Sequence, residues 1–154
     1  MTKITKVEIH EFGFDVPNLG NLTGADSVGA IGYMKGAVSR IEKFALVIIT
    51  EDGCRGEYVT HWCSTPSTCA QTKTLAPKLI GRHAEEREGI YDDMKRELRQ
   101  FDHMGQGPID IALWDWAGKQ LDCSVSILLG GYRKKLPAYA RTYHGDRPGG
   151  LDSK

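Results

Sequence analysis

Two short runs carry most of the information in this sequence: Pro108-Ile109-Asp110-Ile111-Ala112-Leu113-Trp114-Asp115-Trp116-Ala117-Gly118-Lys119 and, a few residues later, Leu128-Leu129-Gly130-Gly131. The first run has helical spacing, because one face collects positions i, i+3, i+4, i+7, i+8 and i+11, namely Ile109, Ala112, Leu113, Trp116, Ala117 and Gln120. Its small residues predict close packing against a sheet. Trp114, Asp115 and Lys119 lie elsewhere on the wheel, and this position predicts packing and domain contact rather than chemistry.

The elements upstream of this helix predict a small sheet followed by helices. Residues 3–14 alternate as a half-buried strand, and residues 40–60 form a hairpin around Glu51-Asp52-Gly53. Between them, residues 15–35 are rich in Gly and Asn and predict a long loop, which in a compact domain is often functional. Helical patterns follow at residues 65–81 and 84–100, and one more strand is predicted at residues 136–143. The fold class is therefore α+β, an antiparallel meander followed by a helical bundle.

Composition excludes several classes of protein. The 154 residues carry 20 Lys+Arg and 20 Asp+Glu, and this zero net charge argues against a nucleic-acid binder. The longest apolar run, residues 44–49, has strand length, so no membrane span is expected. Residues 1–6 lack the apolar core of an export signal, which predicts a cytoplasmic protein.

No catalytic motif is visible in the residues themselves. The chain lacks a Walker loop, a dinucleotide fingerprint, a nucleophile elbow and a His-Glu-x-x-His pair. Asp110 and Asp115 are five residues apart on a helix, so their side chains diverge by about 140° and do not converge on a metal. The spacing of the four cysteines lacks the paired geometry of zinc sites, and we expect free thiols. These residues are Cys54, Cys63, Cys69 and Cys123.

The run from Pro108 to Lys119 and the Leu128-Leu129-Gly130-Gly131 tail together resemble the enolase superfamily, in the subgroup of mandelate racemase and muconate-lactonising enzymes. In that subgroup a similar helix closes an N-terminal capping domain and leads into the first barrel strand. The run Leu75-Ala76-Pro77-Lys78-Leu79-Ile80-Gly81 and the order of elements are similar too. The resemblance covers residues 3–145.

The resemblance implies a two-domain lyase or isomerase: a racemase, dehydratase or cycloisomerase. Its (β/α) barrel, a TIM barrel, holds Mg²⁺ on three carboxylates, and a barrel base removes the proton alpha to the carboxylate of a small-molecule substrate. Polar and cationic candidates at the barrel mouth favour a hydroxy-acid or sugar-acid dehydratase over a racemase. We also expect a homo-oligomer in which the barrel of the same enzyme contacts the cap.

The length of this chain departs from the two-domain pattern of the family that it resembles. A barrel needs ~250 residues, whereas 23 residues follow Gly131. We therefore assign residues 1–131 to the capping domain and residues 132–154 to the first strand and loop of a truncated barrel. No catalytic base or metal ligand is assigned within this chain, and alone it is expected to be inactive, with an exposed apolar face where the barrel belongs. The alternative is a stand-alone, non-catalytic α+β module for binding or oligomerisation.

The resemblance also implies which residues meet the substrate, since two cap loops close over the barrel mouth. Tyr33 and Lys35 end the first loop, and His61 and Trp62 belong to the second. His61 is a candidate hydrogen-bond donor and Trp62 a candidate wall of the pocket. Packing of Tyr33 against the hairpin, a surface His61 and a core Trp62 are the competing interpretations. On the predicted barrel strand, Arg141 and Tyr143 share one face. An inward Arg141 would favour an acidic substrate, and a structural salt bridge is its alternative.

Overall fold

The computed structural model describes residues 1–21, 31–61 and 65–138, which fall into two compact units. The first comprises Met1–Phe12 and Glu42–Tyr132, and the second comprises Gly13–Ile41 with the residues from Arg133 onward. Strands β1 (Ile4–Asn21) and β2 (Ile31–Thr50) both continue from one unit into the other.

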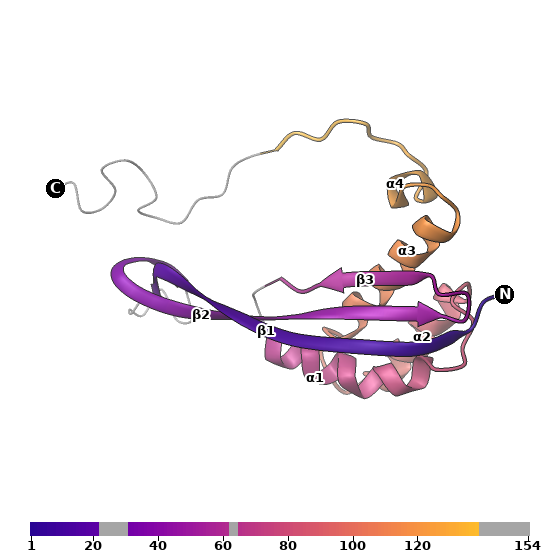
Figure 1. The fold of residues 1–154 in the computed structure, drawn as a ribbon, viewed down its shortest axis with the longest axis horizontal. Helices are drawn as coiled ribbons and strands as arrows, with labels where there is room; N and C mark the ends of the chain where they lie inside the picture. Colours follow the sequence, from indigo (N-terminus) through magenta and orange to yellow (C-terminus); the bar gives the residue numbers. More distant parts are fainter. Residues whose placement is uncertain (22–30, 62–64, 139–154) are drawn as a thin grey trace. The chain divides into compact units, whose positions relative to one another are not determined.

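The first unit contains a sheet of order β1-β2-β3 with helices packed on it (Figure 1). Strand β3 (Arg55–Val59) pairs antiparallel with β2, with Val47 opposite Glu57 and Ile48 opposite Gly56. This register confirms the predicted hairpin. Its turn is closed by Gly53, whose positive φ of 83° suits a glycine.

In the part of the chain that the structure describes, five helical elements follow the sheet, and three of them supply most of the core. They are α1 (Thr65–Leu75), the 3-10 helix η1 (Ala76–Leu79), α2 (Arg87–Glu97), α3 (Gln106–Gln120) and α4 (Val125–Leu128). Alternate residues of β2, Phe44, Leu46 and Ile48, are fully buried in this core. The helices contribute Leu75, Leu79, Ile90, Met94, Leu98, Ile109, Leu113 and Trp116. The α+β architecture predicted from the pattern is confirmed.

Helix α2 is shorter than the predicted helix over residues 84–100. The residues before it are held by the start of the chain, because Ala84 N–H donates to Thr2 C=O at 2.9 Å and Glu85 accepts from Thr2 N–H. These tertiary bonds draw the backbone away from the helical path. Helical periodicity extends into this segment, but the segment's hydrogen bonds go to the N-terminus.

The predicted loop over residues 15–35 is also wrong at both ends. Residues up to Asn21 continue β1, and residues from Ile31 begin β2. Strand pairing is made by the backbone and tolerates Gly and Asn at irregular positions. Asn18 and Gly36 take positive φ values of 56° and 77°, and Asn18 Oδ1 accepts from Gly36 N–H at 2.9 Å. Asn18, one of the residues that indicated a loop, is therefore a local irregularity of a two-stranded ribbon.

The chain after α4 leaves the helical layer at two glycines. Gly130 and Gly131 have φ values of 97° and 59°, and their N–H groups donate to the carbonyls of Ile127 and Ser126 at 2.9 and 2.8 Å. This pair of bonds is a Schellman cap, which explains the Leu-Leu-Gly-Gly tail physically. Residues 136–138 make no strand pairing, and residues 139–143 of the predicted barrel strand lie outside the described residues.

Candidate functional site

Three of the six predicted substrate-facing residues are described. Tyr33 is half-buried and Lys35 exposed on β2, in the second unit, whereas His61 is exposed just after β3, in the first unit. Trp62, Arg141 and Tyr143 lie outside the described residues. The three described candidates therefore lie on two separate segments of the chain.

The segment of His61 begins at a buried threonine. Thr60 is 3% exposed, and it pairs with Phe44 through two bonds. Its N–H donates to Phe44 C=O at 3.0 Å, and its hydroxyl accepts from Phe44 N–H at 3.1 Å. The antiparallel hairpin thus ends in a fixed position immediately before His61.

The same segment ends at a second buried threonine. Thr65, the first residue of α1, is 5% exposed, and its hydroxyl donates to His61 C=O at 3.1 Å. Neither Thr60 nor Thr65 was among the residues predicted from the sequence to belong to the site. The available signal was their position, one on each side of residues 61–64 in a region where strand pattern changes to helix.

The middle of helix α1 is bonded to the loop before α3, away from the segment of His61. Gln71 Oε1 accepts from Gly105 N–H at 2.9 Å, and the Thr72 hydroxyl lies 3.3 Å from Gly105 C=O. A Cβ at Gly105 would lie 2.7 Å from the Thr72 nitrogen, so the glycine permits this close approach. Helix α1 and the start of α3 are therefore in direct contact.

Tyr33 and Lys35 belong to the two-stranded ribbon of the second unit. They are two residues apart on β2 and so project from the same face of the strand. Side chains link the two strands, since the Ser39 hydroxyl donates to Leu19 C=O at 2.8 Å and Arg40 lies 3.4 Å from Asp15. The ribbon presents Lys35 as an exposed cation.

The motif residues of α3 pack against the sheet, as their periodicity predicts. Trp116 Nε1–H donates to the buried Thr50 hydroxyl at 2.9 Å. At Gly56 a Cβ would overlap the Ala112 carbonyl oxygen, so glycine on β3 lets the helix approach. These contacts define an interface between α3, β3 and Thr50 that we call the α3–β3 seam.

Asp115 and Lys119 protect the free edge of β3 at this seam. Asp115 accepts from Glu57 N–H at 2.8 Å, and Lys119 lies 2.7 Å from Asp115 and 2.9 Å from Glu57. Burial alone would lower the pKa of Lys119, but its bonds to these two carboxylates raise it. An unpaired strand N–H invites association, and here a side chain satisfies it. The structure thus gives both motif residues a packing role.

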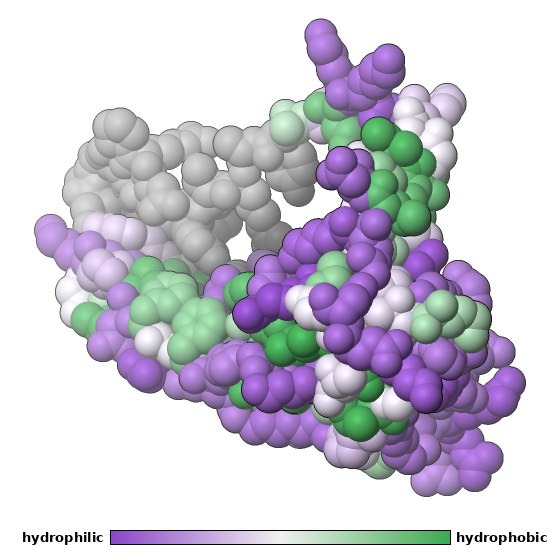
Figure 2. Space-filling view, turned by 45° about the vertical axis from the view of Figure 1, so that its right-hand side comes forward, coloured by the Kyte–Doolittle hydropathy of each residue, from purple (hydrophilic) through white to green (hydrophobic). Residues whose placement is uncertain are grey.

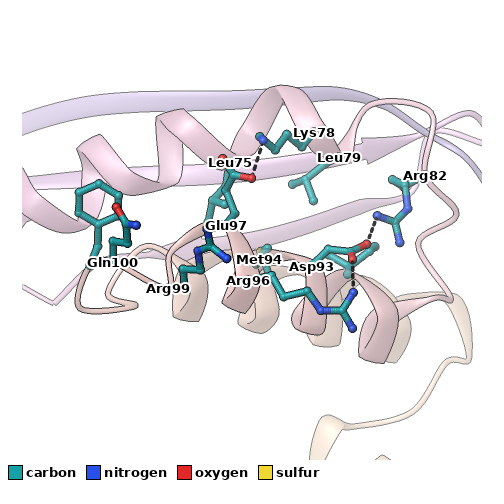
Figure 3. A pocket seen from close by; sticks show the side chains of 12 residues that line it. Leu75, Lys78, Leu79, Arg82, Asp93, Met94, Arg96, Glu97, Arg99 and Gln100 are labelled. Carbon is teal, nitrogen blue, oxygen red and sulfur yellow. Dashed lines mark hydrogen bonds and ion pairs between the residues drawn. The ribbon is translucent and has the colours of Figure 1, made fainter.

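The first unit has a groove of about 630 Å³ between η1 and α2 (Figure 3). Ion pairs join its two walls: Lys78 lies 2.7 Å from Glu97, and Arg82 lies 2.8 Å from Asp93. Of the predicted substrate-facing residues, the three that the structure describes, Tyr33, Lys35 and His61, do not line it. We interpret the groove as a packing seam held by exposed ion pairs.

Helices α3 and α4 leave apolar side chains exposed on the first unit. Leu121, Ile127 and Leu129 are 64%, 64% and 66% exposed, and Ile111 is 48% exposed. Figure 2 shows apolar side chains gathered over this part of the molecule.

Near the start of α3, burial raises the pKa of the Asp110 carboxyl, and the nearby negative charge of Glu88 raises it further.

The described residues contain no group of three or more His, Cys, Asp or Glu side chains that could hold a metal. Cys54, Cys69 and Cys123 are free thiols, as expected, and Cys63 lies outside the described residues. Within residues 1–21, 31–61 and 65–138, none of the helices is long and apolar enough to cross a bilayer.

Residues 33–130 match the sequence family described as mandelate racemase / muconate lactonizing enzyme, N-terminal domain. The chain is 32% identical over 106 residues to an arabinonate dehydratase of Saccharolobus solfataricus, covering 64% of this chain and 28% of that protein. It is 31% identical over 112 residues to a D-galactarolactone cycloisomerase of Agrobacterium fabrum, covering 68% and 30%. The chain thus spans less than a third of both relatives.

A solved structure with a similar fold is the D-glucarate dehydratase of Agrobacterium tumefaciens, complexed with magnesium. The TM-score is 0.67 at 28% identity, and the alignment covers 89% of this chain and 35% of that one. The sheet and helices described above therefore correspond to about the first third of a longer polypeptide in that relative.

Proposed function

The chain belongs to the mandelate racemase/muconate lactonizing enzyme family, and from this premise we propose that it is the capping part of a longer Mg²⁺-dependent enzyme. That enzyme removes the proton alpha to the carboxylate of a hydroxy acid or sugar acid. Of the possible outcomes, we propose dehydration, in which the β-hydroxyl leaves and the resulting enol becomes a 2-oxo acid.

The observation that carries this proposal is the match of residues 33–130 together with the names of the relatives. One relative is named as a dehydratase of arabinonate and the other as a cycloisomerase of D-galactarolactone. Both names point to oxidised sugars as the substrate class. Two of the three relatives described above are dehydratases, which favours water loss over racemisation.

The chemistry requires groups that the described part of this chain does not supply. The α-proton of a carboxylate is very weakly acidic, and a bound Mg²⁺ would stabilise the negative charge that develops as it leaves. The described residues do not form a metal site, so the metal and the base are proposed to belong to the barrel. The contribution of this chain is to bind the substrate, orient it and exclude water.

Each candidate residue has a proposed role in that contribution. His61 donates a hydrogen bond to a substrate hydroxyl, and Trp62 forms a wall of the pocket. Lys35 and Tyr33 bind the polar end of the substrate distant from the reacting carbon. Arg141 holds a carboxylate bidentately, with Tyr143 beside it. A cation at Lys35 and a guanidinium at Arg141 suit an acidic substrate.

The exposed apolar side chains of α3 and α4 support a contact with the barrel of the same enzyme. Leu121, Ile127 and Leu129 would otherwise face water. We place the domain boundary near Gly131, where the Schellman cap ends the helical layer. The complete enzyme is proposed to act in the cytoplasm as a homo-oligomer.

The test is an assay of the complete enzyme that contains this chain. It is incubated with Mg²⁺ and, separately, with arabinonate, D-glucarate and D-galactarolactone, and formation of a 2-oxo acid is measured. We expect Mg²⁺-dependent 2-oxo acid from at least one of the two acids. Isomerisation of the lactone without 2-oxo acid would reassign the reaction, and no Mg²⁺-dependent conversion of any of the three would overturn the proposal. Activity would also decide against a stand-alone module.

A further inference from the structure

Two buried hydroxyl groups stand on either side of the four residues 61–64. The exposed fractions of Thr60 and Thr65 are 3% and 5%, although threonine is ordinarily a surface residue. Burying a hydroxyl costs free energy unless a hydrogen bond replaces the lost water. Both threonines make such bonds, and both bonds constrain the backbone next to His61.

The two bonds act at different ends of the segment. Thr60 is joined to the fully buried Phe44 of β2, whose N–H donates to the Thr60 hydroxyl at 3.1 Å. Thr65 reaches back four residues, and its hydroxyl donates to His61 C=O at 3.1 Å. One bond therefore ties the residue before His61 to the sheet, and the other ties His61 itself to α1.

We infer that Thr60 and Thr65 are positioning residues, which hold the backbone of His61 so that its exposed imidazole meets the substrate in one orientation. The inference rests on the function proposed above. A side chain on a fixed backbone loses less conformational entropy when it binds, and a small displacement of a binding group weakens the interaction strongly. The two hydroxyls thus act on substrate binding through His61, without contact with the substrate.

A purely structural role for these threonines makes a different prediction, and the chain offers a matched control. Thr72 lies on the same helix as Thr65 and is fully buried. Its hydroxyl donates to Thr68 C=O at 2.8 Å and lies 3.3 Å from Gly105 C=O, on bonds that do not involve His61. Thr72→Val therefore removes a comparable hydroxyl and reports the effect of lost stability alone.

The experiment uses the complete enzyme and the variants Thr60→Val, Thr65→Val, Thr65→Ser and Thr72→Val. Valine preserves the bulk of threonine but removes the hydroxyl, whereas serine retains it. We measure KM and kcat for arabinonate and D-glucarate, and hydrogen–deuterium exchange of the peptide that contains His61. Loss of one hydrogen bond of ordinary net strength corresponds to a change of about fivefold.

We expect Thr65→Val to raise KM about fivefold with kcat within about twofold, and to speed exchange at His61 by a similar factor. Thr60→Val should act in the same direction. Thr65→Ser should restore both values, and Thr72→Val should leave KM and exchange at His61 unchanged. In a His61→Ala background, Thr65→Val should have no further effect on KM, because the residue it positions is gone.

Two results would overturn the inference: unchanged exchange at His61 in Thr65→Val, or an increase in KM that persists in the His61→Ala background. Failure of the proposed function is a separate outcome. If neither acid is turned over, the proposed function and the substrate role of His61 are both wrong. In that case, faster exchange at His61 in Thr65→Val would still establish that the Thr65 hydroxyl holds the His61 backbone.

Discussion

The α3–β3 seam and the segment around His61 differ in what is held in place. At the seam, Gly56 brings the strand against the helix backbone, and Trp116 is bonded across the core to Thr50. At His61 the side chain is exposed, and the structure holds the backbone through Thr60 and Thr65. At the seam, packing holds side chains in place. Around His61, hydrogen bonds hold the backbone in place, and the His61 side chain is exposed. Residues typical of the family at the seam thus indicate the architecture and say little about the substrate.

The sharpest test of this difference is Gly56→Ala. Its Cβ would overlap the Ala112 carbonyl oxygen and lie 2.7 Å from Trp116 Cβ, with backbone on one side that cannot move freely. We expect the free energy of unfolding, measured by chemical denaturation, to fall by about 3 kcal/mol. This value is at the upper end of the usual loss when an extra methyl group is forced into a packed core. Gly107→Ala is the matched control on α3, since nothing lies within 4 Å of its Cβ position. A Gly56→Ala variant as stable as Gly107→Ala would disprove the tight seam.

A smaller loss is expected from Trp116→Phe. The change removes the buried hydrogen bond to Thr50 and part of the ring, at a cost of about 2 kcal/mol. A double-mutant cycle with Thr50→Val isolates the bond, and we expect a coupling of roughly 1 kcal/mol. Strictly additive effects would show that shape, and not the hydrogen bond, dominates at this position.

The hairpin turn beside the seam should respond to acid. The Thr50 hydroxyl and the Cys54 N–H donate to Asp52 and lower its pKa, and Gln120 adds a bond from α3. A pKa lower in the folded than in the unfolded chain contributes stability above about pH 4, which is lost as the pH falls through the folded value.

We therefore expect Asp52→Asn to flatten the fall of the melting temperature between about pH 5 and pH 2. Asp92→Asn, which removes an exposed carboxylate on α2 that pairs with Arg96 at 3.4 Å, is measured beside it as a surface-charge control. An unchanged slope in Asp52→Asn would contradict the role assigned to this carboxylate.

The smallest effect on stability is expected away from the seam, at Lys35 on the ribbon. Because this side chain is exposed, Lys35→Met should change the free energy of unfolding by less than about 0.5 kcal/mol. In the complete enzyme the same variant should raise KM for D-glucarate several-fold if the cation binds an acidic substrate. A variant with unchanged KM would remove Lys35 from the proposed site.

The pattern of apolar residues predicted the strands, helices and seam accurately where burial repeats with a regular period. Ile109, Ala112, Leu113 and Trp116 are all buried on one face of α3. The prediction was wrong where tertiary bonds compete with local preference, at residues 84–86 and along the ribbon. It gave His61 as a candidate but not Thr60 and Thr65, because a hydroxyl's partners are set by folding and leave no periodic signal.

The sequence by itself determined the α+β class, because packing a helix on a sheet demands small and apolar residues at fixed spacing, and the family was indicated by the resemblance of residues 108–119 and 128–131. Only the tertiary structure decided which polar groups pair. Asp115 accepts from a strand 58 residues away, and Thr60 meets Phe44 across the hairpin. Such pairs depend on the distance and direction of single atoms, which exist only once the chain has folded.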